Sequence, residues 1–229
     1  MGLATFRGGV HPFEGKELSM DRAVTVLKPT SGEMVYPLSQ HIGAPAKAIV
    51  KVGDEVLVGQ KIAEAGGFIS AVVVSSVSGK VKKIEPRVTA GGAKSISIVI
   101  ENDGLYTAVE GLGEDRDATK LSKQEIRDIV REAGIVGLGG AGFPTNVKLT
   151  PKDESKIDYV IVNGAECEPY LTCDYRMMIE EPERLVGGLK VMLQLFENAK
   201  AVIGIENNKP NAIETLRALV KDEPKITVE

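Results

Sequence analysis

The pattern of apolar residues changes once along the chain, and this change most constrains what the chain can fold into. Between residues 34 and 100, short Val- and Ile-rich runs alternate with glycine turns such as Gly53-Asp54 and Gly66-Gly67. From residue 122 onward, apolar runs alternate with longer amphipathic segments. The first pattern is typical of short strands joined by turns, and the second of strand–helix–strand units around a parallel sheet. The sequence therefore predicts a β module followed by an α/β domain.

Five strands are expected in the first part. The spacing of the glycines disfavours a helix, because glycine in a helix interior is destabilising. A small barrel or sandwich is the expected architecture. The expected strands are Ala48–Val52, Glu55–Val58, Ile69–Val74, Lys80–Ile84 and Ser95–Ile100.

The second part follows an acidic, glycine-containing linker at residues 110–117. Ser122 and Glu125 have the spacing of a capping box, in which each side chain accepts a hydrogen bond from an unpaired backbone N–H at the start of a helix. Gly134 stands where this helix should end. The elements expected after it are a strand at 159–162, a helix at 183–196, a strand at 201–205, a helix at 211–220 and a short apolar run at 226–228.

Composition excludes several classes of protein. The net charge of −4 argues against a dedicated nucleic-acid surface. No apolar run approaches the roughly 18 residues of a membrane helix. The chain has two Cys, at 167 and 173, and two His, at 11 and 41, far from the cysteines. These residues cannot supply the four local ligands of a structural zinc site or the four thiolates of a four-iron cluster.

The run at 137–142 reads Gly-Leu-Gly-Gly-Ala-Gly and matches the G-x-G-x-x-G pattern of dinucleotide-binding loops. That fingerprint needs a strand before the glycines and a helix after them. Here a capped helix comes first, and Phe143-Pro144 follows, so an ordinary Rossmann loop is disfavoured. Glycine backbone can still approach a phosphate or a planar ring, with Lys148 as a nearby charge. The alternative is a plain surface turn.

A second candidate segment, Asn163–Pro169, comes directly after the apolar run at 159–162. Ligands of open α/β sheets bind beyond the carboxyl ends of the strands. Asn163 can donate and accept hydrogen bonds, while Glu166 and Glu168 could accept them from ribose hydroxyls or from cofactor N–H groups. The alternative is a polar loop with solvated carboxylates, and the residues alone leave both possibilities open.

The cysteines and histidines offer little sign of catalysis. Cys167 and Cys173 are expected to be reduced and buried, and a catalytic thiol is disfavoured because no base lies nearby in sequence. His11 and His41 are expected in loops or turns rather than as ligands.

The β module resembles the biotinyl/lipoyl-carrier fold over residues 52–64 and 75–81. Carriers attach their prosthetic group to a lysine at the hairpin tip, and no lysine lies between Ile62 and Gly79. A structural or docking copy of that fold is therefore expected rather than a swinging arm.

Four motifs, in this order, resemble the C subunit of the Rnf electron-transport complex, the ion-translocating ferredoxin:NAD oxidoreductase. They are Phe6–Pro12, His41–Pro45, Gly139–Thr145 and Asn163–Tyr170. The last two also resemble the NADH- and FMN-binding region of the flavoprotein subunit of respiratory complex I. The resemblance implies an α/β, multi-domain protein, with a small biotinyl/lipoyl-like β barrel-sandwich followed by a Rossmann-like α/β FMN/NADH-binding domain. The expected parts are an N-terminal extension at 1–33, the β module at 34–109 and the nucleotide-binding domain at 118–229, truncated at its C-terminal side.

Carried over by position, the resemblance implies two sets of contacts and no catalytic side chain or metal ligand in this chain. FMN would contact Gly137, Gly139, Gly140, Lys148, Asn163 and Glu166. NADH would contact Phe143, Glu168 and Glu206, with Phe143 stacking on an aromatic ring. Two residues depart from the complex I pattern: Ala165 replaces an acid, and Leu138 stands where a basic residue is common.

The resemblance implies a peripheral subunit at the cytoplasmic face of the cell membrane. Its complex would exchange electrons between NAD(H) and ferredoxin through FMN and iron–sulfur centres, with [4Fe–4S] clusters only in a missing C-terminal part. The expected partners are the other Rnf subunits, integral membrane ones included, and ferredoxin at the level of the complex, but no nucleic acid. Two alternatives are a non-enzymatic assembly or docking module and a soluble NAD-dependent dehydrogenase. The dehydrogenase needs a strand directly before Gly137 and a helix starting near Gly142.

Overall fold

The computed structural model describes residues 12–138 and 140–229, which divide into two compact units. The β unit is Leu27–Glu154. The α/β unit contains the described residues up to Val26 together with Ser155–Glu229. These units are defined by contacts within the folded chain, whereas the predicted boundaries at 33, 109 and 118 came from the sequence pattern. The predicted boundaries therefore stay predictions.

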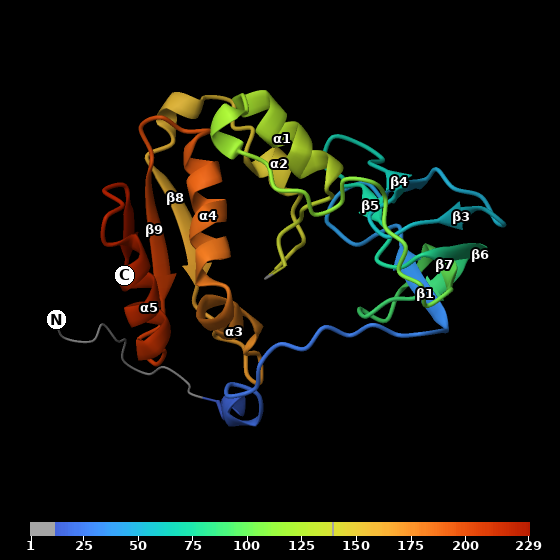
Figure 1. Ribbon diagram of the computed structural model, residues 1–229, viewed down its shortest axis with the longest axis horizontal. Coiled ribbons are helices and arrows are strands. Elements are labelled where there is room, and N and C mark those ends of the chain that lie inside the picture. Colours follow the sequence, from blue (N-terminus) through green and yellow to red (C-terminus); the bar gives the residue numbers. More distant parts are fainter. Residues whose placement is uncertain (1–11, 139) are drawn as a thin grey trace. The chain divides into compact units, whose positions relative to one another are not determined.

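The β unit contains two antiparallel sheets (Figure 1). The four-stranded sheet has the order β1-β7-β6-β3, with β1 at Glu33–Pro37, β3 at Glu55–Val56, β6 at Gly79–Val88 and β7 at Lys94–Asn102. The three-stranded sheet has the order β2-β4-β5, with β2 at Lys47–Ala48, β4 at Lys61–Glu64 and β5 at Val73–Val74. A β-rich first part was predicted, although β2, β3 and β5 are shorter than the apolar runs suggested.

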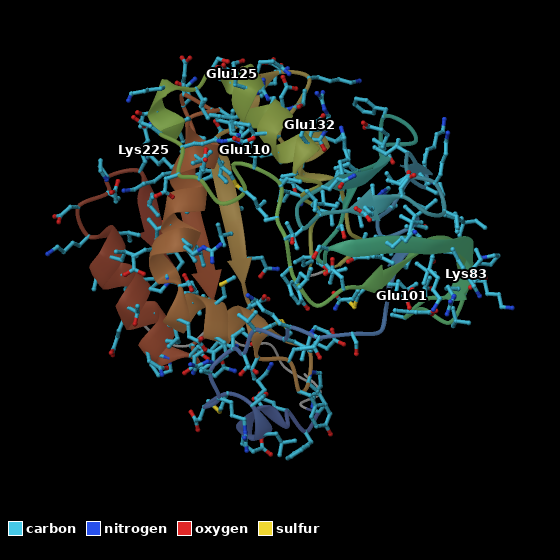
Figure 2. The ribbon with its side chains drawn as sticks, turned by 45° about the vertical axis from the view of Figure 1, so that its right-hand side comes forward. Lys83, Glu101, Glu110, Glu125, Glu132 and Lys225 are labelled. Atoms are coloured by element: carbon cyan, nitrogen blue, oxygen red, sulfur yellow. The ribbon has the colours of Figure 1, made fainter. Side chains whose placement is uncertain are left out.

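The core of the β unit forms between these sheets from the inward side chains of its strands. Ile98 and Ile100 on β7 and Ile62 on β4 are fully buried. On β6 and β7, Val81 pairs with Ile100, and the register shifts between Val81 and Lys83. Figure 2 shows charged side chains, Lys83 and Glu101 among them, on the outer surface of this unit. Residues such as Val81 and Ile100 thus face the core, while charged residues such as Lys83 and Glu101 face outward.

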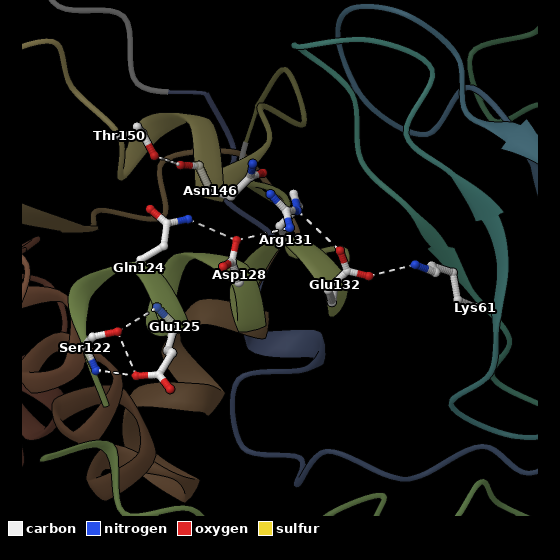
Figure 3. Close-up of polar contacts among 9 residues, drawn as sticks. All are labelled: Lys61, Ser122, Gln124, Glu125, Asp128, Arg131, Glu132, Asn146 and Thr150. Carbon is white, nitrogen blue, oxygen red and sulfur yellow. Dashed lines mark hydrogen bonds and ion pairs between the residues drawn. The ribbon is translucent and has the colours of Figure 1, made fainter. Parts of the chain in front are cut away.

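Helix α1 (Lys123–Glu132) begins with the predicted capping box (Figure 3). The Ser122 hydroxyl accepts a hydrogen bond from the Glu125 N–H, and the Glu125 carboxylate accepts one from the Ser122 N–H. The helix ends before Gly134, whose φ of 66° is the left-handed conformation that glycine adopts without strain. Close to this end, Lys61 on β4 donates to the Glu132 carboxylate at 2.7 Å. Both ends of α1 are therefore fixed, and its C-terminal end is tied to the β sheets.

The α/β unit has a three-stranded parallel sheet in the order β10-β9-β8, with β8 at Tyr159–Gly164, β9 at Lys200–Ile205 and β10 at Ile226–Val228. Helices α3 (Cys173–Glu180), α4 (Pro182–Leu193) and α5 (Pro210–Val220) share one core with it. Figure 1 shows α4 alongside β8 and β9. The predicted strands and the helices α4 and α5 are confirmed, with bounds shifted by a few residues.

Helix α3 was not predicted from the sequence. It is eight residues long, and its N-cap residue, Thr172, makes no side-chain capping hydrogen bond. Tertiary contacts hold it instead: Tyr175 and Met178 are buried, and Asn211 of α5 donates to the Tyr175 hydroxyl at 2.7 Å. Among the described helices of both units, none is long and apolar enough to cross a membrane.

Candidate functional site

The glycine loop, residues 137–143, is the tip of a narrow turn in the β unit that follows α1. Val136 pairs with Pro144 in an isolated bridge, and the Gly137 N–H donates to the Phe143 carbonyl at 3.0 Å. The element before the loop is thus a helix and a single bridge rather than a strand. The helix after it, α2 (Thr145–Lys148), is only four residues long. A soluble dehydrogenase needs a strand directly before Gly137 and a helix starting near Gly142. The backbone observed here therefore excludes that alternative.

Two of the described glycines in this loop are not required by the protein's own packing. Gly142 has a φ of 63°, and a Cβ there would lie 3.2 Å from the Gln40 carbonyl oxygen, so glycine is needed. A Cβ on Gly140 would meet no atom of the other described residues within 4 Å, and one on Gly137 would make only ordinary contacts at 3.9 Å. The space over Gly137 and Gly140 therefore fits a ligand lying against the backbone. Gly139 lies outside the described residues.

A pocket of about 480 Å³ opens beside the glycine loop. One wall is the loop itself, and the other comes from Gln40, His41 and Ile42 of the β module. His41 Nε2 accepts a hydrogen bond from the Ala71 N–H at 3.0 Å, so in the neutral ring Nδ1 carries the proton and faces the Ile42 carbonyl at 3.1 Å. His41 lies in a loop, as predicted, but its place in this second wall was not predicted. The His41–Pro45 motif could have indicated this wall, because it is one of the four motifs of the family resemblance and had no other role assigned to it.

The other predicted residues near this loop differ in exposure. Lys148 is exposed at the end of α2, and Phe143 is half-buried. Leu138, which stands where a basic residue is common in the complex I pattern, is 95% exposed and lines the pocket. Among the predicted site residues, Lys148 is the positively charged side chain nearest in sequence to the glycine loop.

The acid loop, residues 165–172, joins β8 to α3 in the α/β unit. Glu166 is only 4% exposed, and its Oε1 accepts a hydrogen bond from the Asp174 N–H in the first turn of α3 at 2.8 Å. Its Oε2 is also buried, and among the described residues no group hydrogen-bonds to it. Glu168 is exposed near the middle of the loop, while the Asn163 amide oxygen accepts from the Ala165 N–H. A buried carboxylate oxygen without a partner is costly, and a ligand N–H or O–H would satisfy it.

Glu206 follows β9, next to β8 in the sheet, so the parallel register brings it to the same edge as the acid loop. Burial alone would raise the pKa of Glu206, but hydrogen bonds from Lys209 and Cys167, with the charges of Lys209 and Lys16, outweigh burial and lower it. The Lys209 Nζ lies 2.7 Å from the Glu206 carboxylate. Glu206 is therefore held as an anion beside the acid loop.

The two cysteines are free, as expected, but both are exposed, so the expectation of burial was wrong. The hydrogen bond to Glu206 and the negative charge of that residue raise the pKa of the Cys167 thiol, which disfavours a reactive thiolate. Donor atoms of Glu166, Cys173 and Asp174 lie within 4.8 Å of one another. Two of these residues are exposed, so we assign no metal to them.

Comparison with known proteins gives two family matches. Residues 4–105 match the RnfC barrel sandwich hybrid domain, and residues 130–229 match the Nuo51 FMN-binding domain. The C subunit of a proton-translocating ferredoxin:NAD(+) oxidoreductase complex from Clostridium ljungdahlii is 46% identical over 94% of this chain and 47% of its own length. The corresponding subunit of a Na(+)-translocating complex from Acetobacterium woodii is 45% identical over 98% of this chain and 50% of its own length.

The chain belongs to the RnfC family, the C subunits of Rnf complexes. The C subunit of an ion-translocating oxidoreductase complex from Haemophilus influenzae is also similar, at 37% identity over 99% of this chain and 35% of that protein. The chain thus spans half or less of the length of these relatives. The predicted order, a barrel sandwich followed by an α/β FMN-binding domain, is confirmed for this member of the RnfC family.

Proposed function

We propose that this chain is the NADH- and FMN-binding part of a subunit in an ion-translocating ferredoxin:NAD oxidoreductase complex. The observation that carries the proposal is a Glu166 carboxylate oxygen that is buried and has no hydrogen-bond partner among the described residues, in a domain of the FMN-binding family. The open space over Gly137 and Gly140 supports it. The relatives named above are subunits of complexes with this activity.

The residues of the chain would divide the work of binding. The backbone of Gly137, Gly139 and Gly140 would lie against the flavin phosphate and ribityl chain, with Lys148 as a point charge. Asn163 and Glu166 would hydrogen-bond the polar edge of the ring. When bound, FMN supplies the conversion of a two-electron hydride into single electrons.

The nicotinamide nucleotide would be held by a second set of residues. Phe143 would stack on an aromatic ring of NADH, because it is half-buried and still presents part of its ring. Glu168 is exposed and would accept from ribose hydroxyls, as would Glu206, whose charge Lys209 and Lys16 maintain. These carboxylates would orient the nucleotide rather than take part in a covalent step.

The remaining parts of the electron path would lie outside this chain. We place the [4Fe–4S] clusters in the part of the relatives that this chain does not span. The proposed partners are the other subunits of the complex, integral membrane subunits included, and ferredoxin at the level of the complex. The subunit would attach peripherally at the cytoplasmic face of the membrane.

A titration of the 229-residue chain with FMN tests the proposal. Flavin absorbance and fluorescence should change with saturation, and amide hydrogen exchange should slow in residues 137–143 and 163–168 of the same sample. A folded chain that leaves both signals unchanged at high-micromolar FMN would contradict the proposal. A module that only docks partners predicts that FMN and NADH leave the melting temperature unchanged, whereas a ligand of the folded state raises it.

A further inference from the structure

A segment far upstream in sequence packs on the acid loop. We call Phe13–Val24 the N-terminal strap; it belongs to the α/β unit, although the β unit follows it in the chain. The Tyr170 N–H donates to the Glu14 carbonyl at 2.7 Å. The Ser19 and Thr172 hydroxyls lie 2.8 Å apart, and the Val24 N–H donates to the Glu180 carboxylate at 3.0 Å. The strap therefore follows the acid loop and then α3.

Lys16 is the centre of this contact. Its Nζ donates to three backbone carbonyls of the acid loop: Glu166 at 2.6 Å, Glu168 at 3.0 Å and Leu171 at 2.7 Å. An ammonium group has three N–H donors, so these bonds use all of them. The side chain is only 9% exposed. One lysine thus closes the loop by gathering three carbonyl groups that would otherwise repel one another.

The backbone on both sides of this contact is constrained. Gly15 has a φ of 62° and Tyr170 a φ of 67°, which is uncommon for a residue with a side chain. The Tyr170 ring lies against Gly15, where a Cβ would collide with it, and its edge meets the Phe13 ring. Such strain persists only where the surroundings hold the chain in place, and it is common at ligand sites.

We propose that Lys16 is a positioning residue for the nucleotide site. By holding the carbonyls of Glu166 and Glu168, it fixes the loop so that the Glu166 carboxylate is buried while the Glu168 side chain stays exposed. Lys16 also lines a small cavity of about 90 Å³ together with Glu166 and Lys209. Its effect on ligands acts through the loop, and this part of the inference rests on the proposed function.

The strap is not part of the helical core. The buried cluster formed by β9, β10 and α3 to α5 includes none of the strap residues. Of the residues in the strap, Met20 is the one that packs against this cluster. Loss of the Lys16 ammonium should therefore release the loop while the sheet and its helices keep their structure. This local effect distinguishes a positioning role from a general contribution to stability.

Amide hydrogen exchange and ligand titration of Lys16→Met and Lys16→Arg test the proposal. The matched control is Lys225→Met, since Lys225 is an exposed lysine of the same unit whose ammonium donates to one backbone carbonyl, that of Glu197. In Lys16→Met, exchange at residues 165–172 should speed up and affinity for FMN and NADH should fall, each about tenfold or more. Exchange in β9, α4 and α5 should not change. Lys16→Arg should recover part of the loss, and Lys225→Met should match the wild type.

Wild-type exchange in the acid loop of Lys16→Met would overturn the proposal. Equal acceleration throughout the α/β unit would also overturn it, because Lys16 would then serve general stability. If Lys16→Met does not fold, Gly15→Ala disturbs the same contact from the strap side and should give the same local acceleration. A wild-type chain that binds neither FMN nor NADH contradicts the proposed function, while the exchange of the acid loop still decides the role of Lys16.

Discussion

The glycine loop and the acid loop differ in what holds them and in what they leave open. The glycine loop is closed at its base by the bridge between Val136 and Pro144, and no other described residue lies within 4 Å of the Cβ position of Gly140. The acid loop is gathered from within by Lys16 and carries a carboxylate that is almost completely buried. The glycine loop therefore leaves space beside its backbone, whereas the acid loop holds a buried carboxylate in a fixed position.

The β module has a second role in this protein. The sequence suggested that it serves structure or docking, but it is also the support of the glycine loop. Lys61 pairs with Glu132 at the end of α1, and a Cβ on Gly134 would lie 2.7 Å from the Val72 carbonyl oxygen. Gly142 packs against Gln40 and His41. The module therefore fixes where the glycine loop stands.

The largest effect is expected from filling the empty position with Gly140→Val. We expect FMN affinity to fall about 10- to 100-fold, because added side-chain volume would occupy the space of the ligand. Thermal stability should change little, since no other group in the described part of the chain lies within 4 Å of the new Cβ. Titration by flavin absorbance measures the effect. Gly91→Val is the matched control, because a Cβ on Gly91 would also meet no other described residue within 4 Å. Equal losses of FMN affinity in both variants would show that Gly140 has no special role in binding.

The second effect concerns the glycine that the protein itself needs. Gly142→Ala should lower the free energy of unfolding by about 1–2 kcal/mol, because its φ of 63° is unfavourable for residues with a Cβ. Urea unfolding measures this loss. Gly140→Ala should stay within about 0.5 kcal/mol of the wild type, as surface changes usually do. The two alanine variants thus separate a glycine needed by the backbone from one that leaves space.

A third, smaller effect is expected in the acid loop. Glu166→Gln keeps an oxygen that can accept from the Asp174 N–H but removes the buried charge, whose second oxygen has no partner among the described residues. Stability should stay the same or rise by up to about 1 kcal/mol, while FMN affinity falls. Urea unfolding and flavin titration measure the two quantities. A variant that loses stability and keeps its affinity would show that Glu166 serves the fold instead.

The smallest effect is the pH dependence of the contact between α1 and β4. The hydrogen bond from Lys61 lowers the pKa of Glu132 below its usual value of 4.5, and the charge of Lys61 adds to it. The folded state thus binds fewer protons, so this contribution is present above pH 4.5 and is lost as the pH falls through the lower, folded-state pKa. Both side chains are partly exposed, so it is at most about 0.5 kcal/mol.

Urea midpoints at pH 7 and pH 3 measure this contribution. The wild type should lose slightly more stability than Glu132→Gln between the two pH values, because only the wild type has a carboxylate to protonate at this contact. Identical losses of stability would show that the Lys61–Glu132 pair does not stabilise the contact between α1 and β4.

Local signals predicted the elements that depend on local interactions. The capping box at Ser122 and Glu125 and the stop at Gly134 act within one turn of the chain, and the structure confirms them. The predicted strands and the helices α4 and α5 followed from apolar periodicity. Helix α3 was missed because its stability comes from contacts with distant residues such as Asn211. The short β2, β3 and β5 reflect pairing that the apolar runs do not specify.

The candidate site divides in the same way. The sequence by itself determined that glycines stand at 137–142, that acids follow a buried strand, and that the chain belongs to a flavin-binding family. Only the tertiary structure decided that Gly142 is needed by the backbone while Gly140 is not, that His41 lines the pocket beside the glycines, and that Lys16 holds the acid loop. The physical reason is the separation along the chain over which each kind of interaction acts. Backbone preferences and periodicity act over a few neighbouring residues, whereas Lys16 and Leu171 are 155 residues apart, with the whole β unit between them in the chain.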